Sequence, residues 1–349
     1  MTSEPVRPQN AVRLCAIIFL AGAAIGGAVL ARNLLSDART AIVSVTPYNP
    51  DFAGTRGALN VMMARGDGQG MAIMAQDPLL RRSPIDPAET AYRAQRPLVS
   101  MVAWAVSLGN RALVPLGIAV SSVLGAGMLS LGAAFLLARY EMNPMWGLAV
   151  GILPGATAAV PNGGPETWGL GLVFLGLALW PERRVGAALA FALAGLCRET
   201  YLLVPAALAI WGLARNRHLR LELAVPWIAY GAWVVVVHAA VGAWPWDSRT
   251  GLAGPPFAGF VDATKSWGEE TLANVLVAIL FAMLLVTALR KPGPLRPVAL
   301  AYLGLAIVMG DQVWGRWENF SRALLPAYAL GLVALLRDWP RSAATPAPG

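Results

Sequence analysis

The chain has 349 residues, of which 57% are hydrophobic and only 13% are charged, whereas about a quarter of the residues in an ordinary soluble domain are charged. Together with a mean hydropathy of +0.57, this composition predicts several membrane-spanning helices. The net charge of +8 comes almost entirely from arginine, because Lys265 and Lys291 are the only lysines. No polar domain gathers this charge, which argues against nucleic-acid binding and favours basic residues at helix ends.

The first elements surround a long polar segment. Residues 1–10 are polar, and residues 14–31 form an apolar run long enough to span a membrane. This run is longer than the core of a usual signal peptide, so we expect an uncleaved anchor, with a cleaved signal peptide as the alternative. A polar loop follows at 33–96, and the apolar stretch 97–109 is short enough to predict an interfacial or re-entrant helix.

The rest of the chain predicts nine further spans, separated by Pro, Gly and Arg. They lie at about 112–138, 144–160, 166–180, 185–197, 200–214, 221–243, 271–289, 297–310 and 322–336. With the first anchor this gives a single all-α membrane domain over 1–349, with about ten crossings and a polar tail at 341–349. The short segments 185–197 and 200–214 predict a hairpin whose tip, Arg198-Glu199, is reached from a water-filled cavity.

The distribution of basic residues predicts the orientation. If the N-terminus is cytoplasmic, thirteen basic residues from Arg7 to Arg341 lie at cytoplasmic helix ends. The short outer loops then hold five: Arg198, Arg249, Lys265, Arg316 and Arg322. Because basic residues favour the cytoplasmic side, both termini are expected there.

This topology places many polar groups on the outer side, where ionisable residues near a membrane often mark a functional path. They are Asp67, Asp77, Arg96, Asn162, Glu166, Arg198, Glu199, Asp247, Asp311, Arg316 and Arg322. Asp247 and Arg316 can equally be ordinary loop residues. For Arg198-Glu199 a functional role is favoured, and a structural ion pair at the tip is the alternative.

The residue types indicate group transfer from a phosphate donor. An arginine fork suits a phosphate group, and a carboxylate can take a proton from a hydroxyl. Within the predicted spans next to them, neither Arg198 nor Arg322 has a carboxylate three or four residues away, so an anionic ligand is expected to pair with them. Two cysteines and two histidines, far apart in the chain, predict neither a disulfide framework nor a zinc site.

Several short motifs resemble the GT-C superfamily of polytopic glycosyltransferases, especially uncharacterised bacterial members with an Asp-Gly-Gln loop. They are Asp67-Gly-Gln69 with Asp77-Pro78, Tyr92 to Pro97, Pro165-Glu166-Thr167, Leu196 to Thr200, and Arg322 to Pro326. One feature departs from the family, whose acidic residue commonly stands close after the first helix, often in an acidic pair. Asp67 lies about 35 residues beyond the first span and has no acidic neighbour.

The resemblance implies inverting transfer of a sugar from a polyprenyl-phosphate donor to a lipid or glycan hydroxyl, on the outer face of a bacterial inner membrane. It places the catalytic base at Asp67, with Asp77 or Asp51 as rivals, and leaves only a divalent cation open as a cofactor. Arg198 and Arg322 would hold the leaving phosphate, while Gln69, Arg96, Glu166 and Glu199 would contribute to substrate binding. Trp244 and Trp246 could contact sugar, although interfacial tryptophans are the more ordinary explanation.

Two other functions stay open. A transporter or flippase of lipid-linked sugars would place charges near the middle of the bilayer and could show inverted repeats, of which none is evident. A non-catalytic component of an envelope-polymer assembly is the second alternative.

Overall fold

The computed structural model describes residues 8–40, 66–81, 86–180, 182–216, 220–247, 252–290 and 293–338, and these ranges are helical throughout, with short connections. The N-terminal half holds α1 (Pro8–Thr40), α3 (Gly66–Gln76), α4 (Pro87–Ala94), α5 (Pro97–Val106), α6 (Val114–Arg139), α7 (Gly147–Val150), α8 (Pro154–Ala159) and α9 (Pro165–Leu179). The remainder holds α10 (Arg184–Cys197), α11 (Leu203–Asn216), α12 (Val225–Val241), α13 (Ala258–Thr264), α14 (Thr271–Arg290), α15 (Leu295–Val308), α16 (Asp311–Trp314), α17 (Trp317–Ala323) and α18 (Leu325–Asp338). Short 3-10 turns lead into several of these helices, among them η4 (Val160–Asn162), η5 (Glu199–Leu202) and η6 (Leu221–Ala224).

Four helical segments are long and apolar enough to cross a membrane: Asn10–Leu35, Arg111–Arg139, Leu221–Val241 and Gly268–Arg290. Two bent pairs, Pro144–Val150 with Pro154–Asn162 and Trp317–Ala323 with Leu325–Arg337, raise this to six if each pair is one span. The described part of the chain is therefore helical and contains several helices that could cross a membrane.

The ten predicted crossings are only partly matched by these lengths. Each predicted span does coincide with a helix or a bent pair, but α9, α10, α11 and α15 have only 14 or 15 residues. At 1.5 Å per residue such a helix is about 22 Å long, which is shorter than the hydrocarbon core of about 30 Å. These four helices cannot cross a full bilayer as straight, isolated rods.

Two predictions from the sequence need correction: the length of the first helix and the packing of the 185–197 and 200–214 segments. The first helix runs from Pro8 to Thr40, beyond the expected 14–31, because the polar residues at its ends continue the helix. The predicted 185–197 and 200–214 hairpin also opens out: α10 packs mainly on α9 and α12, whereas α11 packs on α15. The tip Arg198-Glu199 thus lies at a branch point between several helices.

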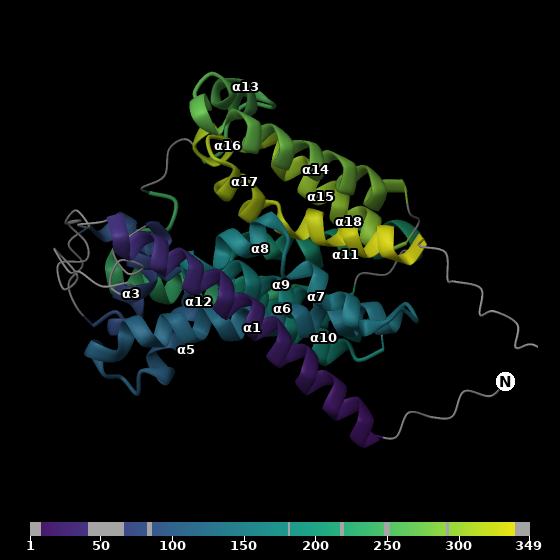
Figure 1. Cartoon of the computed structure of the whole chain (residues 1–349), viewed down its shortest axis with the longest axis horizontal. Helices are drawn as coiled ribbons and strands as arrows, with labels where there is room; N and C mark the ends of the chain where they lie inside the picture. Colours follow the sequence, from purple (N-terminus) through teal and green to yellow (C-terminus); the bar gives the residue numbers. More distant parts are fainter. Residues whose placement is uncertain are drawn as a thin grey trace, which may run out of the picture.

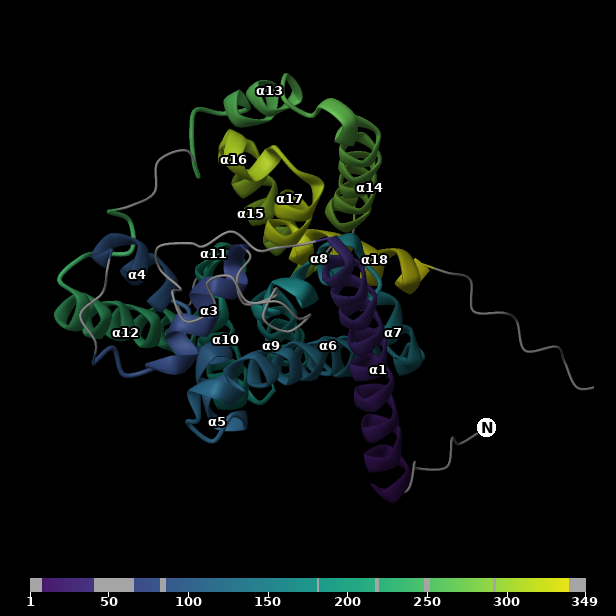
Figure 2. The ribbon, with the colours of Figure 1, turned by 60° about the vertical axis from the view of Figure 1, so that its left-hand side comes forward.

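The helix α9 lies at the centre of the packing. It is held between α6 and α10, and α1 packs on α6. Residues along almost its whole length, from Pro165 to Leu177, are buried. Figures 1 and 2 both show α13 to α18 gathered to one side of the helices α1 to α12, with α11 at the border.

Candidate functional site

The polar centre of the molecule is the first turn of α9. Glu166 is the second residue of this helix, and its side chain is only 1% exposed. The turn before it uses Gly163 and Gly164, with φ of +94° and +70°, a conformation that favours glycine. A carboxylate at this position is stabilised by the positive end of the helix dipole.

Two arginines from distant parts of the chain meet the Glu166 carboxylate. Arg198, at the end of α10, forms a hydrogen-bonded ion pair with Oε1 of Glu166. Arg322, on α17, places its Nη1 atom 3.8 Å from the same oxygen. The three side chains are 1%, 15% and 10% exposed for Glu166, Arg198 and Arg322 respectively, so they form a largely buried cluster.

Arg322 lies close to Glu166 because α17 packs tightly on α8. A Cβ atom on Gly155 of α8 would lie 2.1 Å from the backbone oxygen of Ser321, so only glycine permits this approach. Since α8 leads through η4 directly into α9, this contact places Arg322 beside Glu166.

A second ion pair lies next to this cluster, carried by the neighbouring residue of the α10 tip. Arg96, between α4 and α5, donates from Nε and Nη2 to the two oxygens of Glu199, at 2.7 and 2.5 Å. The Tyr92 hydroxyl lies 3.2 Å from Nη2 of Arg96, and its ring faces the guanidinium at 4.9 Å from the centroid. We name Arg96, Glu166, Arg198, Glu199 and Arg322 the charged cluster.

The environment of Glu199 favours its charged form. Burial would raise the pKa of this carboxyl, but the Arg96 charge and hydrogen bonds, together with the Arg198 charge, lower the pKa below its ordinary value. The bidentate Arg96–Glu199 pair is therefore maintained at neutral pH, and it holds the α4–α5 junction against the α10 tip.

Tyrosine hydroxyls fix the backbone around the charged cluster. Tyr201 donates to the backbone oxygen of Glu166 at 2.7 Å, and Tyr302 of α15 donates to the backbone oxygen of Thr200 at 3.0 Å. On the other side, Tyr230 of α12 donates to Oε1 of Gln95 at 2.6 Å. These bonds connect α9, α12 and α15 to the segments that carry the arginines.

The charged cluster has a surplus of one positive charge, because it contains three arginines and two glutamates. The second Glu166 oxygen, Oε2, and the Nε atom of Arg198 are buried without a hydrogen-bond partner within the described residues. Buried polar atoms without partners are costly. This arrangement can receive an anion that also carries hydrogen-bond donors and acceptors.

The structure brings together five of the eight predicted site residues: Arg96, Glu166, Arg198, Glu199 and Arg322. Asp77 is half-buried just after α3. Asp67 and Gln69 belong to the first turn of α3, but their side chains lie outside the described residues, as does Asp51 entirely. The choice between Asp67, Asp77 and Asp51 stays a prediction.

The segment that holds Asp67 nevertheless lies near the charged cluster. Met71, one helical turn after Asp67, lies against Gly163, where a Cβ atom would be 3.2 Å from the Met71 Cγ atom. The Asp67-Gly-Gln69 segment forms the start of α3. The start of α3 is thus packed beside the turn that presents Glu166.

Other polar residues predicted on the same side have local roles. Asp247 accepts from the backbone N–H of Trp244 at 2.7 Å, and the Trp244 ring stacks on His238 and Trp246, with centroids 3.8 and 5.0 Å away. Asn162 donates to the backbone of Ala158. Asp311 and Arg316 are exposed.

The expectation of no nearby carboxylate on the same helix fails for Arg322, because α17 also contains Glu318, four residues before it. Arg198 and Arg322 were expected to lack a protein partner, yet both lie at Glu166, which is far from each of them in the chain. The alternative of an Arg198–Glu199 pair is not what forms either, since the two neighbours pair with different residues. Their side chains diverge, as those of adjacent residues do.

The tyrosines Tyr201, Tyr230 and Tyr302 were missed by the sequence analysis. Tyr230 and Tyr302 stand inside apolar helices, where a hydroxyl needs a partner and is a usable signal. Tyr201 directly follows the Arg198 to Thr200 motif. Among the described residues, no group of three or more His, Cys, Asp or Glu side chains could hold a metal ion.

Comparison with known proteins adds no relative: no family model, no curated protein and no solved structure matches this chain.

Proposed function

We propose that the chain is a GT-C-like membrane glycosyltransferase that uses a polyprenyl-phosphate sugar, and that Arg198 and Arg322 bind the phosphate of this donor. The observation that carries the proposal is the convergence of these two arginines on the single buried carboxylate Glu166. Both guanidinium groups lie at the same carboxylate, and a guanidinium fork is well suited to phosphate oxygens.

The two glutamates have a positioning role in this proposal. Glu166 orients Arg198 and Arg322, and Glu199 orients Arg96, before the donor arrives. Charged groups that are already in place stabilise developing charge without reorganising during the reaction. The growing negative charge on the leaving phosphate would be the charge that they stabilise.

The chemical step transfers the anomeric carbon between two oxygens. The acceptor hydroxyl oxygen forms a bond to this carbon while the bond to the phosphate oxygen breaks, with inversion of configuration. Asp67 takes the hydroxyl proton as general base, with Asp77 and Asp51 as alternatives. The start of α3 packs beside the Glu166 turn, which supports a base from this segment.

The same proposal includes a membrane arrangement. The short apolar helices α9, α10, α11 and α15 lie within the membrane among the longer ones, which gives about ten segments with both termini in the cytoplasm. The charged cluster then faces the outer side of a bacterial inner membrane, where a polyprenyl-phosphate sugar presents its sugar and phosphate.

Transfer can be measured with the full chain in lipid nanodiscs, given radiolabelled polyprenyl-phosphate sugars and extracted envelope lipids and glycans as acceptors. We expect labelled acceptor to form, and Asp67→Asn to lower turnover about 100-fold or more with unchanged protein yield. If Asp77→Asn or Asp51→Asn is inactive and Asp67→Asn is active, Asp67 is not the general base. Movement of the donor across the bilayer without product would identify a flippase and overturn the proposed reaction.

A further inference from the structure

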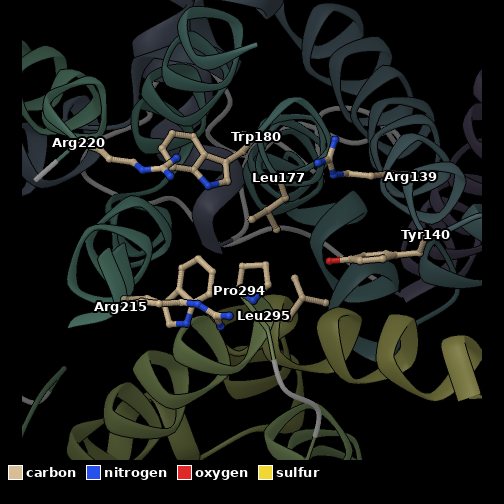
Figure 3. A pocket seen from close by; sticks show the side chains of 9 residues that line it. Arg139, Tyr140, Leu177, Trp180, Arg215, Arg220, Pro294 and Leu295 are labelled. Carbon is tan, nitrogen blue, oxygen red and sulfur yellow. The ribbon is translucent and has the colours of Figure 1, made fainter. Parts of the chain in front are cut away.

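A cavity of about 300 Å³ lies at the opposite end of α9 from the charged cluster. It is surrounded by the ends of α6, α9 and α11, the start of α15 and the residue Arg220 before η6 (Figure 3). The helix α9 begins at the charged cluster and contributes Leu177 and Trp180 to the cavity. The two sites are therefore separated by about 20 Å of helix.

The cavity wall is basic. Arg139, Arg215 and Arg220 line it, and no carboxylate does within the described part of the chain. Glu182 lies 3.2 Å from the lining residue Arg139 and is 75% exposed, and Glu222 lies 3.6 Å from Arg184, which does not line the cavity. The Arg215 and Arg220 charges thus have no acidic residue facing them in the cavity.

Aromatic rings hold two of these arginines in place. The Arg220 guanidinium lies over the Trp180 ring at 4.7 Å, and that of Arg215 lies over the Trp211 ring at 5.6 Å. Such cation–π contacts orient a guanidinium without neutralising it. The Nη1 atom of Arg220 is buried and has no hydrogen-bond partner among the described residues, which identifies a donor waiting for an acceptor.

The shape and the walls narrow the class of ligand. Figure 3 shows the Tyr140 hydroxyl and the Arg215 side chain directed toward the same space, beside Leu295 and Leu177. Arginine donors match phosphate oxygens, and the volume is at the lower limit of ligand sites, enough for a headgroup but not for a whole lipid. Apolar side chains close to the lining residues in the chain are exposed on the protein surface, such as Leu213 and Leu221, which are 50% and 74% exposed.

We propose that this cavity binds the phosphate headgroup of an anionic phospholipid, whose chains lie along the adjacent apolar helix surface. The arginine bias places this end of the bundle on the cytoplasmic side, where anionic lipids attract basic pockets between helices. A bound lipid would hold the ends of α6, α9 and α11 and the start of α15 together. The site is separate from the proposed donor site and does not depend on glycosyl transfer.

The test is native mass spectrometry of the purified full chain, titrated in detergent with phosphatidylglycerol or with phosphatidylcholine. We expect one phosphatidylglycerol to remain bound and phosphatidylcholine to bind at least about tenfold more weakly, since it lacks net negative charge. Arg220→Gln and Arg215→Gln should each weaken phosphatidylglycerol binding about tenfold. Arg215 is exposed, so its substitution tests the proposal even if Arg220→Gln lowers stability.

Arg290→Gln is the matched control, because it removes one exposed arginine at the end of α14, outside the cavity lining. It should leave phosphatidylglycerol binding unchanged. Equal binding by the wild type and both cavity variants would overturn the proposal. So would displacement of the lipid by inorganic phosphate at equal concentration, because the ligand would then be free phosphate and not a lipid.

Discussion

At the scale of single residues, the feature that distinguishes this protein is a buried carboxylate shared by two arginines. The Glu166 carboxylate forms an ion pair with Arg198, and the Nη1 atom of Arg322 lies 3.8 Å from its Oε1 atom. Removing one partner of a buried ion pair leaves an uncompensated charge, which is far more costly than losing an exposed pair. The charged cluster is thus stable only as a set, which suits a site that must be in place before its ligand binds.

The Arg96–Glu199 pair predicts an acid-dependent loss of stability. The pKa of Glu199 is lowered from its ordinary value of 4.5, so its contribution to stability is complete above that value and is lost as pH falls through the lowered pKa. Melting temperature in detergent should fall less steeply in acid for Glu199→Gln than for the wild type. Identical slopes for the two proteins would show that this pair contributes nothing to acid stability.

The identity of the polar residues in the charged cluster was predictable, but their pairing was not. Arg96, Glu166, Arg198, Glu199 and Arg322 were found because ionisable residues are conspicuous beside apolar helices. Which arginine meets which glutamate depends on how helices distant in sequence pack. No local pattern contains that information.

At the scale of elements, α9 organises the structure. Its first turn carries Glu166, its length is buried, and its last residues reach the basic cavity. Helix positions followed from the sequence because apolar runs end at Pro, Gly and Arg, as for α6 and α14. The divergence of α10 from α11 did not follow, since two short helices joined by a tight turn usually pack together.

Close packing of α9 on the α10 tip predicts a strong effect of one methyl group. A Cβ atom on Gly169 would lie 2.0 Å from the Tyr201 ring, whose hydroxyl bonds to the Glu166 backbone. Gly169→Ala should therefore destabilise the protein by about 1–3 kcal/mol through overpacking, seen as a lower melting temperature.

The matched control is Gly212→Ala in α11, where nothing lies within 4 Å of the added atom. Alanine is the better helix former, so this variant should melt at or above the wild-type temperature. If Gly169→Ala melts like Gly212→Ala, the Tyr201 ring is not fixed against α9.

At the scale of the whole molecule, two polar sites lie at opposite ends of one helical bundle. The basic residues assigned to the cytoplasmic side, such as Arg139, Arg215 and Arg220, do gather at one end, and the charged cluster lies at the other. The separation of the two groups was predictable from the loop charges. The basic cavity was not predictable, because its lining comes from four regions that are far apart in the chain.

The orientation can be tested by cysteine labelling in a variant with Cys15 and Cys197 replaced. Asp311→Cys and Arg290→Cys place thiols at two exposed positions on the predicted outer and inner sides. A membrane-impermeant thiol reagent should label the first in intact spheroplasts and the second only after lysis. The reverse pattern would place the charged cluster on the cytoplasmic side.

Binding of the donor phosphate by Arg198 and Arg322 is tested most directly by the KM and kcat for donor and acceptor in Arg198→Lys and Arg322→Lys. Lysine keeps the charge but loses the planar fork, so each variant should lose about 1–3 kcal/mol of transition-state binding, with kcat/KM falling for the donor and the acceptor KM unchanged. The matched control Arg316→Lys, an exposed residue just before α17, should behave like the wild type. Normal use of the donor by both Arg198→Lys and Arg322→Lys would contradict the account and make these arginines structural partners of Glu166.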